Sequence, residues 1–124
     1  MLVISWLRRK RVPRPGDIWW AQVPYVRGRG SKLRPCVILR NNSDGILVLK
    51  ITSQNKSHRR DHLLIPTRRW DPYAKKDSYL NLGEPILVPR AEFQRRAGRA
   101  AWAVRRRMRS VRIPPAGDRR HGTP

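Results

Sequence analysis

The stretch from Arg34 to Thr52 constrains the fold most strongly, because it has the pattern of a β-hairpin. Its sequence, RPCVILRNNSDGILVLKIT, contains two runs rich in aliphatic and β-branched residues, Cys36 to Leu39 and Ile46 to Ile51. The turn-forming cluster Asn-Asn-Ser-Asp-Gly at 41–45 separates these runs. The pattern therefore predicts a hairpin at residues 34–52, and the turn sets how its two strands pair.

The pairing of the two strands predicts which side chains share a face. If Arg40 lies opposite Ile46, Arg34 lies directly across from Thr52. Side chains alternate between faces along a strand, so one face is wholly apolar and is expected to be core: Val37, Leu39, Leu47, Leu49 and Ile51. The other face is expected to be half exposed and open to an anionic partner; it carries Arg34, Cys36, Ile38, Arg40, Ile46, Val48, Lys50 and Thr52.

Short strands dominate the rest of the pattern. Residues 17–23 alternate as a first strand with Trp19 and Trp20 on opposite faces, one expected in the core and the other expected to cover the barrel or to stack on a base. Further strands are predicted at 62–67, 78–82 and 86–88, a short helix at 91–97, and a final helix along an apolar stripe of Ala100, Val104, Met108 and Val111. The expected fold is mainly β: a small, partly open barrel with a C-terminal helix.

Length and charge limit the organisation of the chain and its partners. With 124 residues there is room for one domain, expected at 15–113 between a basic arm at 1–14 and a disordered tail at 114–124. The 29 Lys and Arg residues outnumber 8 Asp and Glu, and the net charge of +21 favours a polyanionic partner. A single cysteine suits a reducing cytoplasm, and the apolar N-terminal run is too short for a membrane span, so we expect a cytoplasmic protein without membrane contact.

Four blocks of sequence in order resemble the PemK/MazF family of toxin ribonucleases. They are PGDIWWAQVP, GSKLRPCVIL, LKITSQ and SYLNLGEPILVP, and with the basic helix they span Pro15 to Arg112. The resemblance implies an SH3-like barrel, a homodimer, metal-free cleavage of single-stranded RNA at short sequences, and inhibition by a co-encoded acidic antitoxin. It also implies catalytic roles for the arginine of the Arg-Pro pair and the threonine of the Ile-Thr pair, which are Arg34 and Thr52 here.

The chemistry of RNA cleavage agrees with these two residues. When a ribose 2′-hydroxyl attacks the adjacent phosphate, charge builds on the phosphoryl oxygens, and the guanidinium of Arg34 can meet two of them. The hydroxyl of Thr52 can donate to the same phosphate or orient the attacking oxygen. The expected substrate-binding residues are Arg27, Arg29, Ser31, Lys32, Lys50 and Ser53. Three candidates for acid–base roles, for each of which a structural or solvated role stays open, are His58, Asp61 and His62.

Two other functions compete with a toxin ribonuclease. The same barrel and charge could serve a noncatalytic nucleic-acid-binding module, and the charge alone could serve a ribosome-associated structural protein. The pairing of Arg34 with Thr52 speaks against both, because binding alone does not need a hydroxyl opposite one arginine. The eight carboxylates are scattered, so neither a metal site nor another cofactor is expected.

Overall fold

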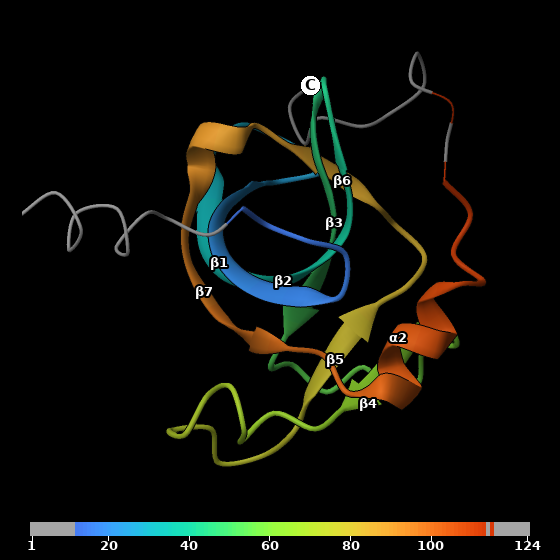
Figure 1. Cartoon of the computed structure of the whole chain (residues 1–124). Helices are drawn as coiled ribbons and strands as arrows, with labels where there is room; N and C mark the ends of the chain where they lie inside the picture. The colour runs from blue at the N-terminus through green and yellow to red at the C-terminus, as the bar shows by residue number, and fades with distance from the viewer. Residues whose placement is uncertain (1–11, 114, 116–124) are drawn as a thin grey trace, which may run out of the picture.

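Seven antiparallel strands form one sheet in the computed structural model, which describes residues 12–113 and 115 (Figure 1). The strand order is β4-β5-β3-β2-β1-β7, and β6 pairs with β3 beyond the end of β5. The elements in chain order are β1 (Asp17–Pro24), β2 (Ser31–Asn42), β3 (Gly45–Thr52), β4 (His62–Ile65), β5 (Ser78–Asn81), β6 (Ile86–Val88), the 3-10 helix η1 (Arg90–Glu92), β7 (Phe93–Arg99) and α2 (Trp102–Met108). The end strands β4 and β7 do not pair, so the barrel is partly open, as predicted.

The central hairpin is confirmed, and its predicted register is right in its middle, from Cys36 to Ile38. Cys36 pairs with Lys50 and Ile38 with Val48, as predicted. The expected pairing of Arg40 with Ile46 is wrong, because a bulge shifts the register between Ile38 and Arg40. Arg40 pairs with Leu47 instead, and the two strands close on a turn between Asn42 and Gly45. Gly45 has a φ of 138°, a conformation that side-chain-bearing residues rarely adopt, which explains why glycine ends this turn.

Arg34 and Thr52 do not form a paired position in the ladder between β2 and β3. That ladder reaches only to Cys36 and Lys50. Arg34 pairs with Ala21 of β1, and Thr52 pairs with Tyr79 of β5. The two residues therefore come from the same end of the hairpin but belong to different neighbouring pairs.

Both faces of the hairpin are buried, each by a different layer. The predicted apolar face is core, and it packs under α2, Ile65 and Leu80. This cluster is called the outer core below. The middle of the opposite face was expected to be half exposed, and this was wrong. Cys36, Ile38, Ile46 and Val48 are fully buried there, because β1, β6 and Phe93 curl over them to form the barrel interior: Trp19, Ala21, Val23, Ile86 and Val88 complete this second core.

The two neighbouring tryptophans lie on opposite faces, as predicted. Trp19 is in the barrel interior and meets Phe93 edge to face, with ring centroids 6.2 Å apart. Trp20 is partly buried against the outer core, and the guanidinium of Arg95 lies 5.2 Å from its ring centroid. Trp20 also lines the cleft described below.

The expected short helix at 91–97 was wrong, since most of this segment is strand β7. Only Arg90–Glu92 forms a helical turn, and β7 then pairs with β1 through two register shifts. Asp17, at the start of β1, is buried and accepts from Arg96 at 3.3 Å and Arg99 at 3.1 Å. These contacts and the backbone bonds to β1 outweigh the helix preference of an Ala- and Arg-rich segment.

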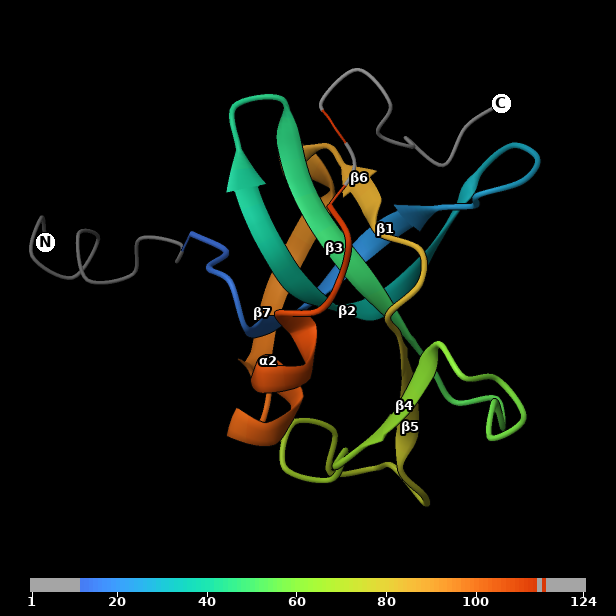
Figure 2. The same ribbon diagram turned by 90° about the vertical axis from the view of Figure 1, so that its right-hand side faces the viewer.

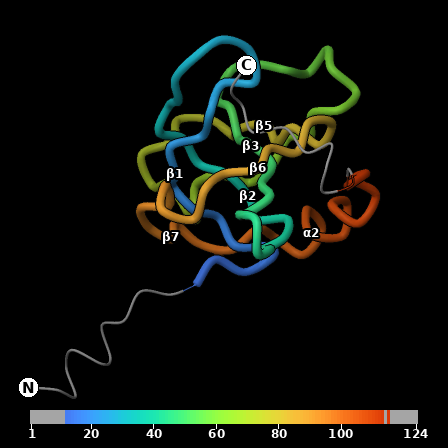
Figure 3. The backbone as a smooth tube through the Cα atoms, turned by 90° about the horizontal axis from the view of Figure 1, so that it is seen from above, coloured from blue at the N-terminus to red at the C-terminus, as the bar shows by residue number. Residues whose placement is uncertain are grey.

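Helix α2 lies at the side of the barrel, next to the outer core (Figures 2 and 3). The four residues of the predicted apolar stripe pack in this core or against it, but the helix is shorter than predicted: Val104 and Met108 lie on α2, whereas Ala100 precedes it and Val111 follows it. No helix within residues 12–113 is long and apolar enough to cross a membrane. Most of the expected basic arm at 1–14 and of the expected tail at 114–124 lies outside the described residues.

Candidate active site

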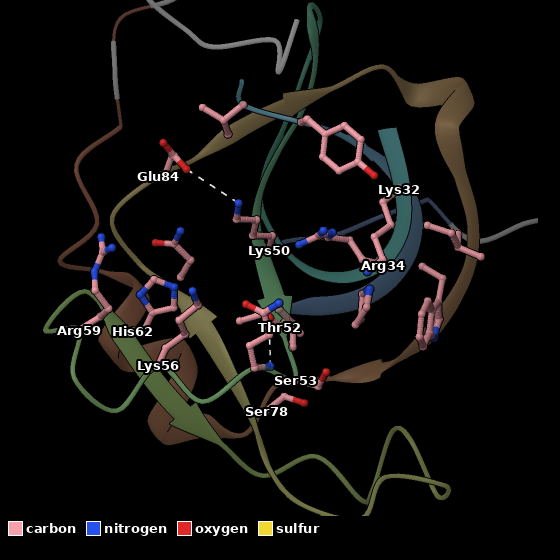
Figure 4. A pocket seen from close by; sticks show the side chains of 18 of the residues that line it. Lys32, Arg34, Lys50, Thr52, Ser53, Lys56, Arg59, His62, Ser78 and Glu84 are labelled. Atoms are coloured by element: carbon pink, nitrogen blue, oxygen red, sulfur yellow. Dashed lines mark hydrogen bonds and ion pairs between the residues drawn. The ribbon is translucent and has the colours of Figure 1, made fainter. Parts of the chain in front are cut away.

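A cleft of about 800 Å³ opens at one end of the barrel, where β2 and β3 diverge beyond the Cys36–Lys50 pair (Figure 4). The loop between β1 and β2 and the residues that follow β3 form its walls. Its lining contains two carboxylates, Asp71 and Glu84, against six Lys or Arg side chains: Arg27, Lys32, Arg34, Lys50, Lys56 and Arg59. A cleft with this excess of cations attracts an anionic ligand.

Arg34 and Thr52 both point into this cleft from neighbouring strands (Figure 4). Arg34 is partly buried and forms no ion pair with any described residue, so its guanidinium can bind an external anion. The Oγ1 atom of Thr52 accepts a hydrogen bond from the backbone N–H of Gln54 at 3.2 Å. This bond fixes the hydroxyl group and leaves its proton for donation into the cleft.

Lys50 lies between Arg34 and Glu84 in the cleft (Figure 4). Its Nζ atom is 3.9 Å from Oε1 of Glu84. Burial lowers the pKa of Lys50; Glu84 partly opposes this effect, and the positive charges of Arg34 and Lys56 add to it. An ammonium group that is desolvated in this way gains more from a bound anion than a fully hydrated one.

The strand register explains why polar side chains from three strands face the cleft together. Ile51, Leu80 and Leu63 are paired across β3, β5 and β4, and all three pack in the outer core. Side chains alternate along a strand, so their sequence neighbours point to the opposite face. That face carries Lys50, Thr52, Asn81 and His62, and each of them lines the cleft.

His62 and Asp61 form a hydrogen-bonded pair beside the cleft. The Nδ1 atom of His62 lies 2.8 Å from Oδ1 of Asp61, and Oδ2 of Asp61 accepts from Arg59 at 3.2 Å. The hydrogen bond from His62, with a smaller contribution from Arg59, holds the pKa of Asp61 below its usual range. Asp61 is therefore an ionised acceptor at neutral pH.

The structure brings together most of the predicted site residues. The cleft contains Arg34 and Thr52 together with five other predicted residues: Arg27, Lys32, Lys50, Ser53 and His62. Four predicted residues do not line it: Arg29, Ser31, His58 and Asp61. Ser31 instead donates to Oε1 of Gln22 at 3.1 Å, and His58 is exposed, whereas Asp61 reaches the cleft through His62.

Sequence reasoning missed several residues that line the cleft. Lys56 and Arg59 follow Thr52 closely in the polar stretch SQNKSHRRD, so their proximity in sequence was an available signal. Asn81 gave no such signal, since it is one polar residue at the end of a short strand and only the pairing with His62 brings it to the cleft. Within residues 12–113, His, Cys, Asp and Glu side chains form no group of three or more that could hold a metal ion.

Comparison with known proteins identifies the family of the chain. A comparison with curated proteins gave no significant match. The family model of the PemK-like, MazF-like toxin of type II toxin-antitoxin system matches residues 14–112, which cover both walls of the cleft and helix α2. Because this match covers most of the chain, the protein belongs to the PemK-like, MazF-like family and is a toxin of a type II toxin–antitoxin system.

Proposed function

We propose that this toxin is an endoribonuclease that cuts single-stranded RNA, and that the cleft around Arg34 and Thr52 is its active site. The observation that carries the proposal is that one cation-lined cleft contains a fixed hydroxyl and a guanidinium that has no ion pair with any residue the structure describes. The phosphodiester backbone of a nucleic acid is a ligand that such charge favours. Family membership implies an antitoxin partner, and the net charge of +21 suits an acidic one.

The proposed reaction is an internal transesterification. The 2′-oxygen of the RNA attacks the adjacent phosphorus, the bond from phosphorus to the 5′-oxygen breaks, and the products are a 2′,3′-cyclic phosphate and a 5′-hydroxyl. Arg34 binds two phosphoryl oxygens as their negative charge grows, and Thr52 donates its hydroxyl proton to the same phosphate. Arg34 supplies the positive charge that other nucleases obtain from metal ions, so the reaction proceeds without metal.

Other side chains of the cleft are placed to hold the RNA strand. Lys32, Arg27 and Lys50 contact flanking phosphates, and Ser53 adds a hydrogen bond beside Thr52. Contacts in the loop between β1 and β2 select the bases that are cut. We also propose that two copies form a homodimer, with a shared RNA groove, and that the toxin acts on mRNA in the cytoplasm.

The decisive test compares Arg34→Ala with a matched control on the same strand. Arg40 is exposed at the far end of β2 and lies outside the cleft, so Arg40→Ala removes one charge without touching the site. We expect Arg34→Ala to lower the cleavage rate about a hundredfold or more, because it removes charge stabilisation at the phosphoryl group. Cleavage by Arg40→Ala should stay within twofold of the wild type.

The same assay tests the reaction type. Cleavage of a long unstructured RNA should be unchanged in excess EDTA and should stop when the 2′-hydroxyl at the cut site is replaced by hydrogen. Cleavage that requires magnesium, or that proceeds on the deoxy-substituted strand, would contradict the mechanism. A wild-type protein that binds RNA without cutting it would instead establish a noncatalytic binding module.

A further inference from the structure

His62 is buried in the wall of the cleft but keeps one ring nitrogen available. Its side chain is 6% exposed, and its Nδ1 atom is bonded to Asp61. Its Nε2 atom has no hydrogen-bond partner among the described residues. His62 lies next to Lys56, on the side of Thr52 away from Arg34 (Figure 4).

Asp61 is held in place from several directions, which makes it a rigid partner for His62. Arg59 donates to its carboxylate, and its backbone carbonyl accepts from the N–H of Leu82 at 2.7 Å. Gly83 leaves the space that the Asp61 side chain occupies, since a Cβ atom at position 83 would lie 2.6 Å from Oδ2 of Asp61. The Asp61 carboxylate is thus held next to Nδ1 of His62 by the bond from Arg59 and by its place beside Gly83.

The ionised carboxylate determines which tautomer His62 adopts. Nδ1 must carry a proton in order to donate to Asp61, so in the neutral ring the lone pair is on Nε2. An uncharged His62 therefore presents a proton acceptor, and not a donor, from its second nitrogen.

His62 also lies at a suitable distance from the phosphate-binding pair. Strand β5 lies between β3 and β4, and Thr52 pairs with Tyr79 whereas His62 pairs with Asn81. The backbones that carry Thr52 and His62 are therefore two strand spacings and two residues apart, or about 12 Å. Their side chains rise from the same face of the sheet and shorten this gap. Thr52 and His62 both line the cleft, so a ribose whose 3′-phosphate was bound by Arg34 and Thr52 would lie on the side of the cleft where His62 stands.

We propose that His62 is the general base of the RNA cleavage and that Asp61 is its positioning residue. Nε2 takes the proton of the 2′-hydroxyl as the 2′-oxygen forms its bond to phosphorus, while the bond to the 5′-oxygen breaks and water supplies the proton of the new 5′-hydroxyl. This inference rests on the proposed ribonuclease function and assigns a step that Arg34 and Thr52 cannot perform.

Charged groups from several elements surround His62. They are Lys50 on β3, Lys56 and Arg59 on the loop before β4, and the carboxylates of Asp61 and Glu84. A base must be uncharged to act, so the cleavage rate should rise with pH as His62 loses its proton. The tested range is about pH 5 to 8, where histidine side chains commonly change charge.

The experiment measures single-turnover cleavage of a short RNA by His62→Gln, with His58→Gln as the matched control. His58 is exposed and lies outside the cleft, so its replacement should leave the rate within twofold of the wild type. The cleavage rate of His62→Gln should be about a hundredfold or more below that of the wild type, and the rise of its rate with pH should disappear. Its affinity for a 2′-deoxy, uncleavable strand should stay within twofold of the wild type.

Two further variants separate catalysis and positioning from a structural role. In His62→Ala, free imidazole should restore part of the rate, in proportion to its concentration. Asp61→Asn should lower the cleavage rate while its affinity for the 2′-deoxy strand stays within twofold of the wild type, because the carboxylate that holds Nδ1 of His62 is lost. An unchanged rate would remove Asp61 from the positioning role.

Several results would overturn the assignment of His62. They are a wild-type pH profile in His62→Gln, a loss of affinity that equals the loss of rate, or full rescue by a substrate with sulfur as the 5′ leaving atom, which would make His62 an acid. These results are distinguishable from failure of the proposed function. If the wild-type protein does not cut RNA, or if folded Arg34→Ala cuts as fast as the wild type, the ribonuclease site itself is wrong.

Discussion

At the scale of single residues, Lys50 is a cation of the cleft whose burial lowers the stability of the fold. Its pKa is lowered mainly because burial disfavours the ammonium form. Since the pKa is lower in the folded state than in the unfolded state, the charged group destabilises the fold at neutral pH. This cost diminishes as pH rises through the folded pKa toward the unfolded value of about 10.4. Such a cost is typical of residues that are kept for binding.

Replacing Lys50 should therefore separate stability from activity. We expect Lys50→Met to raise the melting temperature by about a few degrees, because methionine fills the space without a buried charge. Glu84 is one-third exposed, so water can still solvate it. RNA affinity should fall at the same time, since a cation of the cleft is lost. Calorimetry and RNA titration check both effects against Lys75→Met, which removes an exposed cation outside the cleft. A lower melting temperature for Lys50→Met would contradict this account.

Among the elements, the seam between β1 and β7 depends most on one side chain. Asp17 is 1% exposed and accepts from Arg96, Arg99 and the backbone N–H of Arg14. We expect Asp17→Asn to lower the free energy of unfolding by about 1–3 kcal/mol, because charge-assisted hydrogen bonds of a buried carboxylate are lost. Urea unfolding measures the change, and exposed Glu92→Gln is the control. Equal stability of the two variants would show that backbone pairing alone holds β7.

The same elements show what the sequence could and could not predict. The hairpin, its apolar face and the α2 stripe were predictable, because periodicity and turn residues are local signals. Strand β7 was not, since FQRRAGR favours a helix locally and becomes a strand only when Asp17 and the edge of β1 meet it. The burial of Cys36 and Ile38 also depends on β1 and β6, which cover them only after the barrel curls.

The candidate site also has residues that the sequence could predict and residues that it could not. Arg34 and Thr52 could be predicted because both lie at the same end of the hairpin, two residues beyond the Cys36–Lys50 pair, and alternation along the strands turns both to the face of that pair. Whether His58 or His62 reaches the cleft could not, since these residues lie four apart in one polar stretch. The pairing of β4 with β5 decides between them by turning His62 inward beside Asn81.

At the scale of the whole molecule, the net charge of +21 is spread far beyond the cleft. Exposed arginines lie on α2, where Arg106 covers the ring of Trp102 at 5.4 Å, and on the outer side of β7. These charges raise the rate of encounter with RNA from any direction. Under the proposed function only the cations of the cleft would contact the strand in the position where it is cut, so the two groups of charges should differ in their effect on salt dependence.

Salt titration of RNA binding tests whether the cations of the cleft and the exposed arginines outside it contribute differently. Each phosphate that is neutralised in single-stranded RNA contributes about −0.7 to the slope of log K against log salt concentration. With a short strand that fills only the cleft, Arg34→Ala should make the slope shallower by about 0.7, whereas Arg40→Ala should leave it unchanged. With a long strand, the wild-type slope should be steeper than with the short one, because exposed arginines outside the cleft then contact phosphates as well. Equal slopes for Arg34→Ala and Arg40→Ala on the short strand would mean that binding follows total charge and that the cleft does not position the phosphate.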